Sequence, residues 1–82
     1  MYILSFFTNS GVPETGLSPT INIRGVPSGD LIVSAGNMSE VGDGFYCYEF
    51  TEGSPNEEYA ARTDGGAGLA DIDRYKFIGF SA

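Results

Sequence analysis

Short runs of apolar and β-branched residues alternate along this chain with clusters of glycine, proline, asparagine and aspartate. Runs in which side chains alternate with a period of two predict strands, and the clusters predict the turns between them. The spacing of the turns indicates about seven short strands. We expect these strands at Tyr2 to Thr8, Thr20 to Arg24, Asp30 to Ser34, Met38 to Val41, Phe45 to Phe50, Glu57 to Thr63 and Arg74 to Phe80.

The run from Phe45 to Phe50 is the most aromatic segment of the chain, and it follows the turn signal Gly42-Asp43-Gly44. Glycine reaches positive φ angles without steric penalty, and aspartate hydrogen-bonds to its own backbone, so these residues favour a tight turn. Both faces of the following strand are largely apolar, which predicts a central strand covered on both sides. The faces consist of Phe45, Cys47 and Glu49 on one side and Tyr46, Tyr48 and Phe50 on the other.

The segment Glu57 to Thr63 has two interpretations. Its glutamates, alanines and arginine favour a helix, but the segment is too short for an independent helix, and Gly65-Gly66 stops any extension. We therefore expect a strand that places Tyr59, Ala61 and Thr63 on one side.

The same periodicity assigns faces to two other strands and leaves loops between them. Ile21 and Ile23 share a buried face of the second strand. The third strand is expected to end at Ala35-Gly36-Asn37, and loops are expected at Thr51 to Asn56 and at the glycine-rich Asp64 to Asp73. In the last strand, alternation places Tyr75, Phe77 and Gly79 opposite to Lys76, Ile78 and Phe80.

The chain is predicted to form one all-β domain over residues 1 to 82, a small antiparallel β-sandwich. A hydrophobic content of 41% with 13% aromatic residues is ordinary for a folded domain. A chain of this length buries only about 60–65% of the surface that its unfolded form exposes. We therefore expect its stability as a monomer to be modest.

Eleven acidic residues against four basic ones give a net charge of −7. Binding to nucleic acid or to an anionic membrane needs a cationic patch, so neither is expected as a partner. The acidity favours solubility or a basic protein surface as partner. The apolar start of the chain has no preceding basic residue and is too short for a signal peptide or a membrane span, so we interpret it as a first strand.

The residue inventory contains no visible catalytic apparatus, and no enzyme activity and no cofactor are predicted. The chain has no histidine, which removes Ser-His-Asp and Cys-His arrangements and the commonest zinc ligand. The single Cys47 lies within an aromatic strand, where a free cysteine is usually a small buried hydrophobic residue. It has no disulfide partner in the chain, which suits a reducing compartment of origin.

Acidic side chains are the remaining candidates for chemistry. Paired carboxylates of a glycosidase need a substrate cleft, for which a sandwich of this size has little volume. Asp64, Asp71 and Asp73 flank the carbonyl-rich Gly65 to Gly68, and oxygens of this kind are calcium ligands, but the spacing fails the EF-hand pattern. We favour a flexible polar loop and predict no metal.

Aromatic side chains gather at the two ends of the sequence. Terminal strands of a small sandwich are often edge strands, so these side chains are candidates for an interface. The alternative is that they belong to the core, because a chain of this size needs most of its aromatic residues inside. The candidates are Tyr2, Phe6, Phe7, Tyr75, Phe77 and Phe80.

Several segments together resemble a small immunoglobulin-like module found in structural proteins of tailed bacteriophages. Gly44-Phe45-Tyr46 also contains the G-x-Y element of the immunoglobulin tyrosine corner, without the full spacing and without a second cysteine. Tyr46 is therefore a candidate for locking the adjoining turn. The segments that carry the resemblance are Phe6 to Pro13, Thr15 to Ile21, Met38 to Tyr48, Arg62 to Gly66 and Arg74-Tyr75.

The resemblance implies a non-enzymatic virion protein. Within phages, such modules often form part of longer tail or fibre chains, whereas here one is expected to stand alone from Met1 to Ala82. That suits a cement or decoration protein on the capsid exterior, made in the host cytoplasm, which binds at junctions of the major capsid protein and stabilises the head. A homotrimer at three-fold positions is expected, since symmetric association compensates for a small core.

Three other functions stay open at this point. The first is a tail, fibre or receptor-binding accessory module of a phage. The second is an adhesion or carbohydrate-binding module outside any virus, and the third is a small hydrolase. The resemblance rests on turn and strand residues, which specify a fold better than a role.

Overall fold

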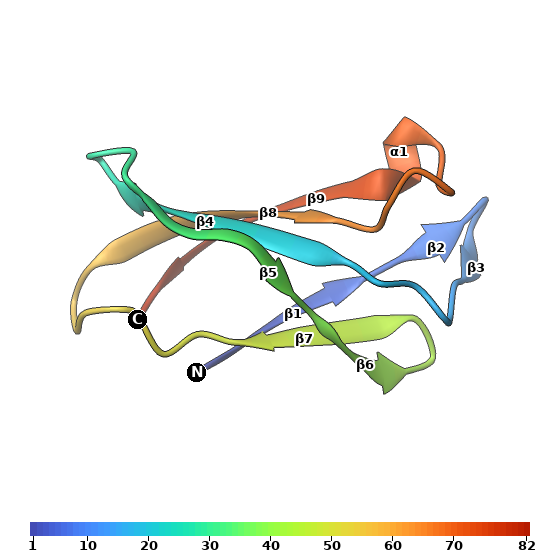
Figure 1. Cartoon of the computed structure of the whole chain (residues 1–82), viewed down its shortest axis with the longest axis horizontal. Coiled ribbons are helices and arrows are strands. Elements are labelled where there is room, and N and C mark those ends of the chain that lie inside the picture. The colour runs from blue at the N-terminus through green and yellow to red at the C-terminus, as the bar shows by residue number, and fades with distance from the viewer.

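Two antiparallel sheets lie one above the other in the computed structural model, which describes all residues from Met1 to Ala82 (Figure 1). One sheet has four strands in the order β5-β4-β8-β9, and the other has three in the order β1-β7-β6. The elements are β1 Tyr2–Phe6, β2 Thr8–Asn9, β3 Val12–Pro13, β4 Thr20–Val26, β5 Leu31–Asn37, β6 Ser39–Gly42, β7 Phe45–Glu49, β8 Glu58–Asp64, α1 Asp71–Arg74 and β9 Tyr75–Ser81.

The strand order is that of an immunoglobulin-like sandwich without its first strand. If β1 is matched to strand B, the three-stranded sheet reads B-E-D and the four-stranded sheet reads C′-C-F-G. All pairings are antiparallel. The predicted fold class, a small all-β sandwich, is confirmed.

Side chains from both sheets fill the space between the layers. Ile3 and Tyr46 come from the three-stranded sheet, and Ile21, Ile23 and Tyr59 from the four-stranded one, and all five are buried. Their alternation along each strand is why one face of every strand is apolar and inward. The predicted buried face of Ile21 and Ile23 is thus confirmed.

Strand β7 is the central strand of its sheet, as predicted, because it lies between β1 and β6. Tyr46 and Phe50 are buried on its inner side, with 0% and 3% of their surface exposed. The predicted cover on the opposite side is wrong. Phe45 stays 45% exposed, since no element packs on the outer face of this sheet.

The chain crosses from one sheet to the other between β5 and β6. The buried Met38 lies at the crossing, where its N–H donates to the carbonyl of Pro19. The predicted break at Ala35-Gly36-Asn37 is wrong, because β5 continues to Asn37 through a bulge. Ala35 has a φ of 50° there, and its N–H donates to Oδ1 of Asn22 at 2.7 Å, which satisfies the amide that the bulge removes from the ladder.

A short hairpin and a short helix were not predicted. Strands β2 and β3 form a hairpin in which Ser10 and Gly11 have φ angles of 53° and 85°, as a tight two-residue hairpin turn requires. Helix α1 adds one helical turn inside the expected loop, with Asp71 and Asp73 in its first turn and Arg74 in its last. That charge order suits the helix dipole.

The segment after Glu57 is a strand and not a helix. β8 pairs with β4 on one side and with β9 on the other, which buries Tyr59, Ala61 and Thr63 as predicted. Packing and two ladders of hydrogen bonds outweigh the helical propensity of the exposed glutamates and alanine.

Candidate functional site

The six terminal aromatic candidates separate into a surface group and a core group. Tyr2, Phe6 and Phe77 are exposed by 62%, 40% and 76% of their surface. Tyr75 is half-buried between neighbouring arginines and is described below. The other two candidates, Phe7 and Phe80, pack inward.

Phe7 belongs to the core and not to a surface. It is fully buried, and its ring meets that of Tyr46 edge to face at a centroid distance of 5.7 Å. Phe80 is partly buried and packs against the core, with its ring 5.6 Å from those of Phe50 and Tyr59. The interface prediction is therefore wrong for Phe7, and Phe80 contributes mainly to packing.

An apolar surface covers the outer face of the three-stranded sheet. Phe6 of β1 and Phe45 of β7 are cross-strand neighbours, and their ring centroids lie 4.8 Å apart. Leu4 of the same strand is 56% exposed, and Val41 in the bulge of β6 is 61% exposed. We call this surface the outer apolar face, and it consists of Tyr2, Leu4, Phe6, Val41 and Phe45.

Sequence reasoning missed Leu4, Val41 and Phe45 as surface residues. The signal lay in the alternation of β1, where Ile3, Ser5 and Phe7 point inward and the residues between them point outward. Ser5 is the only polar residue of β1, and it lies on the buried side. The distribution of hydrophobic residues along the strand therefore does not indicate which face is exposed to solvent.

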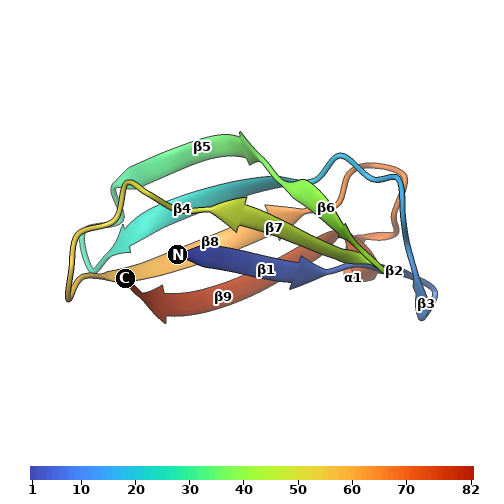
Figure 2. The same cartoon turned by 90° about the horizontal axis from the view of Figure 1, so that it is seen from below.

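A groove runs between the two strands that end the sheets on one side of the sandwich. β1 and β9 lie along this side in Figure 2, and neither has a hydrogen-bonded neighbour on its outer edge. The groove has a volume of about 280 Å³. We call it the edge groove, and its lining residues are Leu4, Ser5, Phe6, Thr63, Lys76, Phe77 and Ile78.

The opposite outer surface, on the four-stranded sheet, carries two of the four basic residues. Arg24 and Arg62 line a hollow of about 270 Å³ together with Asn22 and Phe77. Arg62 also lies 5.0 Å from the ring centre of Tyr75. The two outer surfaces therefore differ: one is apolar, and the other combines arginines with aromatic rings.

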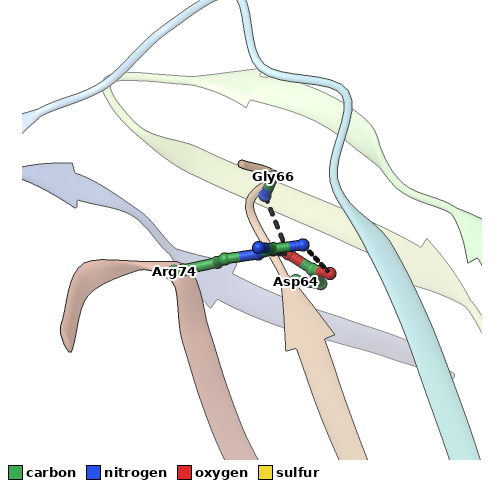
Figure 3. Close-up of polar contacts among 3 residues, drawn as sticks. All are labelled: Asp64, Gly66 and Arg74. Atoms are coloured by element: carbon green, nitrogen blue, oxygen red, sulfur yellow. Dashed lines mark hydrogen bonds and ion pairs between the residues drawn. The ribbon is translucent and has the colours of Figure 1, made fainter. Parts of the chain in front are cut away.

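One ion pair fixes the end of the hairpin that joins β8 to β9. Arg74 donates from Nε to Oδ1 of Asp64 at 2.7 Å and from Nη2 to Oδ2 at 3.1 Å (Figure 3). The N–H of Gly66 donates to the same carboxylate at 2.8 Å. The hydrogen bonds from Arg74 hold the pKa of Asp64 below its usual value, with smaller contributions from Gly66 and from the charge of Arg62.

A second acidic side chain of this region, Asp73, also has protein partners. Asp73 accepts hydrogen bonds from the Ser10 N–H at 3.1 Å and from Oγ1 of Thr8 at 3.4 Å, which ties α1 to the β2–β3 hairpin. No group of three or more cysteine, aspartate and glutamate side chains gathers in the structure in a way that would hold a metal ion. Asp64 and Asp73 therefore act here as anchors for loops.

Two tyrosine hydroxyl groups lock loops at opposite ends of the sandwich. The hydroxyl of Tyr46 donates to the carbonyl of Glu14 at 2.9 Å and accepts from the N–H of Leu17 at 3.2 Å. Tyr46 thus locks the connection between β3 and β4, and the prediction that it locks its own adjoining turn is wrong.

The tyrosine corner is formed by a different residue. Tyr59 is the second residue of β8, which matches strand F, and its hydroxyl accepts from the N–H of Ser54 at 2.7 Å. A tyrosine near the start of strand F that bonds to backbone a few residues upstream defines this motif. The sequence spacing did not reveal it, because the usual aspartate and glycine before the tyrosine are absent.

Cys47 is a free, half-buried thiol on the outer side of β7. A third hollow, of about 410 Å³, lies along the end of the β8–β9 ladder around Ala60 and Gly79. The structure contains no helix that is long and apolar enough to cross a membrane.

Comparison with known proteins gave no match. No family model, no curated protein and no solved structure is similar to this chain at a significant level.

Proposed function

We propose that this chain is a non-enzymatic structural protein of a tailed-phage virion, and that it decorates the capsid as a cement protein. In this proposal it binds at junctions between major capsid protein subunits, on the outside of the head, and stabilises the shell. The observation that carries the proposal is the outer apolar face, an exposed hydrophobic sheet surface on an otherwise acidic chain.

The outer apolar face is a surface suited to another protein. Its five members are exposed by 40% to 62% of their surface. Soluble monomers rarely leave contiguous apolar patches of this kind uncovered, and such patches mark contact sites. The paired rings of Phe6 and Phe45 supply the large aromatic area that interface cores favour.

The segments that carry the phage resemblance come together in space. The N–H of Phe7 donates to the carbonyl of Gly44, and Asp73 binds Thr8 and Ser10, so the β2–β3 hairpin, the β6–β7 turn and α1 meet at one end of the sandwich (Figure 1). Residues that are distant in sequence therefore form one structural unit.

Oligomerisation is part of the proposal. Only 16 of 82 residues are buried, so the monomer has a small core. Association as a trimer at three-fold positions of a capsid would bury exposed apolar surface on each copy and add to its stability.

A binding assay with empty heads tests the proposal. Purified protein is mixed with heads of the phage that encodes it and sedimented, and co-sedimentation that saturates at a fixed ratio to the major capsid protein is expected. The variant Phe45→Ser, on the outer apolar face, is expected to stay in the supernatant. Absence of saturable binding by the unaltered protein would contradict the proposal.

Two alternative functions would use the same exposed surfaces of the chain. A tail, fibre or receptor-binding module would be present in a handful of copies per particle, whereas a cement protein is present in hundreds. A non-viral adhesion or carbohydrate-binding module would use exposed rings such as Phe77 to stack on sugars, and a glycan array detects such binding.

A further inference from the structure

We propose that the edge groove takes an extended segment of a partner protein, which adds as a fifth strand along β9 and places a carboxylate against Lys76. The inference rests on the proposed function only in that the occupant is another protein. It names the mode of recognition, which is strand addition at a sheet edge.

The backbone of β9 offers the hydrogen bonds that strand addition needs. β9 runs over seven residues and is the last strand of its sheet, paired with β8 alone. One of its two edges therefore keeps its N–H and C=O groups free of strand partners. Main-chain bonds along such an edge provide affinity, while pockets for alternate side chains provide selectivity.

The groove beside this edge supplies such a pocket. Inward-facing side chains of a strand added to β9 would cover Ile78, which pairs with the buried Ala61 and is 43% exposed. Burying Ile78 removes apolar area that the free chain leaves in water. The volume of about 280 Å³ suits a few side chains of an extended segment better than a whole small-molecule ligand.

Lys76 determines the charge of the occupant. It pairs with Thr63 in the ladder, faces inward with it, and lines the groove while half-buried. The one ion pair of the molecule joins Arg74 and Asp64, so Lys76 has no acidic partner. In a chain with eleven acidic and four basic residues, an unpaired lysine at an apolar groove calls for a carboxylate from outside.

A second copy of this chain fits the groove less well. Neither β1 nor β9 contains an aspartate or a glutamate, so edge-to-edge pairing of two copies brings no carboxylate to Lys76 from these strands. It also brings two chains of net charge −7 together. An inward-pointing charge on an edge strand is moreover a common device against self-pairing.

The test uses the isotope-labelled full chain and synthetic peptides, and no virus particle. Each seven-residue peptide alternates valine and threonine, and glutamate, glutamine or lysine is placed at each position in turn. The best glutamate peptide is expected to shift backbone amide signals of β9 and β1 and to leave β5 and β6, the other two sheet edges, unchanged. The matching lysine peptide is expected to bind at least about tenfold more weakly.

Three variants separate the role of Lys76 from general charge effects. Lys76→Glu should reverse the preference, and Lys76→Met, which keeps an apolar stem, should bind glutamate and lysine peptides equally. Arg24→Glu makes the same charge change on the outer surface of the same sheet and should leave the preference as it was. Unchanged thermal midpoints show that each variant is folded.

Several results would overturn the inference. They are an absence of amide shifts in β9 with every peptide, equal shifts at β5 or β6, and a preference that Lys76→Glu does not alter. Concentration-dependent shifts of β9 without peptide would identify a second copy as the occupant instead. Peptide binding without any binding to heads would overturn the proposed function and not the groove. Head binding together with an absence of peptide-induced shifts in β9 would overturn the groove and not the proposed function.

Discussion

The hydroxyl oxygens of Ser5 and Thr63 lie 2.8 Å apart and share a buried hydrogen bond between the two sheets. Ser5 is on β1 and Thr63 on β8, which match strands B and F. Antibody domains join these strands by a disulfide whose second cysteine lies two residues after the corner tyrosine, a position held here by Ala61. This chain, with its single cysteine, links the same two strands by a polar pair two residues farther along β8.

We expect the Ser5–Thr63 pair to be strongly coupled. Thr63→Val leaves the Ser5 hydroxyl buried without a partner, which should lower the free energy of unfolding by about 1–3 kcal/mol. The double variant Ser5→Ala/Thr63→Val should cost less than the sum of the two single changes, as measured by urea unfolding. Additive costs would show that the two hydroxyl groups do not act together.

The tyrosine corner predicts a local effect of removing one oxygen atom. Tyr59→Phe takes away the acceptor of the Ser54 N–H and should cost about 1 kcal/mol. Amide hydrogen exchange should become faster from Thr51 to Asn56, the loop that this bond closes. Tyr2→Phe is the matched control, because Tyr2 is 62% exposed and should show no change in either measurement.

The Asp64–Arg74 pair predicts a loss of stability in acid. Because the pKa of Asp64 is lower in the folded chain than its usual value of 3.8, the ionised form stabilises the fold above that value. This contribution should disappear as the pH falls from about 4 through the lowered pKa.

Thermal unfolding across this range checks the effect. Asp64→Asn should be less stable than the unaltered chain at neutral pH and should lose less stability on acidification. Asp30→Asn removes an equal charge at a residue whose side chain has no hydrogen bond in the structure, and it should follow the unaltered chain. Parallel curves for the Asp64→Asn variant and the unaltered chain would contradict this account.

Substitutions of two phenylalanines are expected to have opposite effects on stability and on binding to heads. Phe7→Ala empties a fully buried site and should cost about 3–5 kcal/mol, enough to unfold much of a small domain at room temperature. Phe45→Ser, on the outer apolar face, should change stability by about 1 kcal/mol or less while abolishing binding to heads. Circular dichroism and co-sedimentation measure the two effects, and equal unfolding by both variants would place Phe45 in the core.

Strand faces were predictable wherever one face is polar and the other apolar. Ile21 and Ile23, like Tyr59, Ala61 and Thr63, were assigned correctly, because burial of one face imposes a period of two. The seven longer strands lie at the general positions that the turn residues predict, whereas the two-residue strands β2 and β3 were not predicted. The β5 boundary was missed because the bulge at Ala35 depends on Asn22, a residue of another strand.

The candidate surfaces were harder to predict. In β1 the outward residues Tyr2, Leu4 and Phe6 are apolar and the inward Ser5 is polar, so hydrophobicity gives the wrong face. Ser5 can be buried because Thr63 satisfies it, and that partner is 58 positions away in sequence. The edge groove likewise depends on which strands end the sheets, and only the assembled topology shows that β1 and β9 do.

The most direct measurement is the copy number of this chain in purified particles of the phage that encodes it. Quantitative mass spectrometry, with cryo-electron microscopy to locate the protein, gives this number. We predict hundreds of copies on the outside of the head, at junctions of the major capsid protein. A handful of copies at the tail would favour the accessory-module alternative, and absence from the particles would contradict the proposed function.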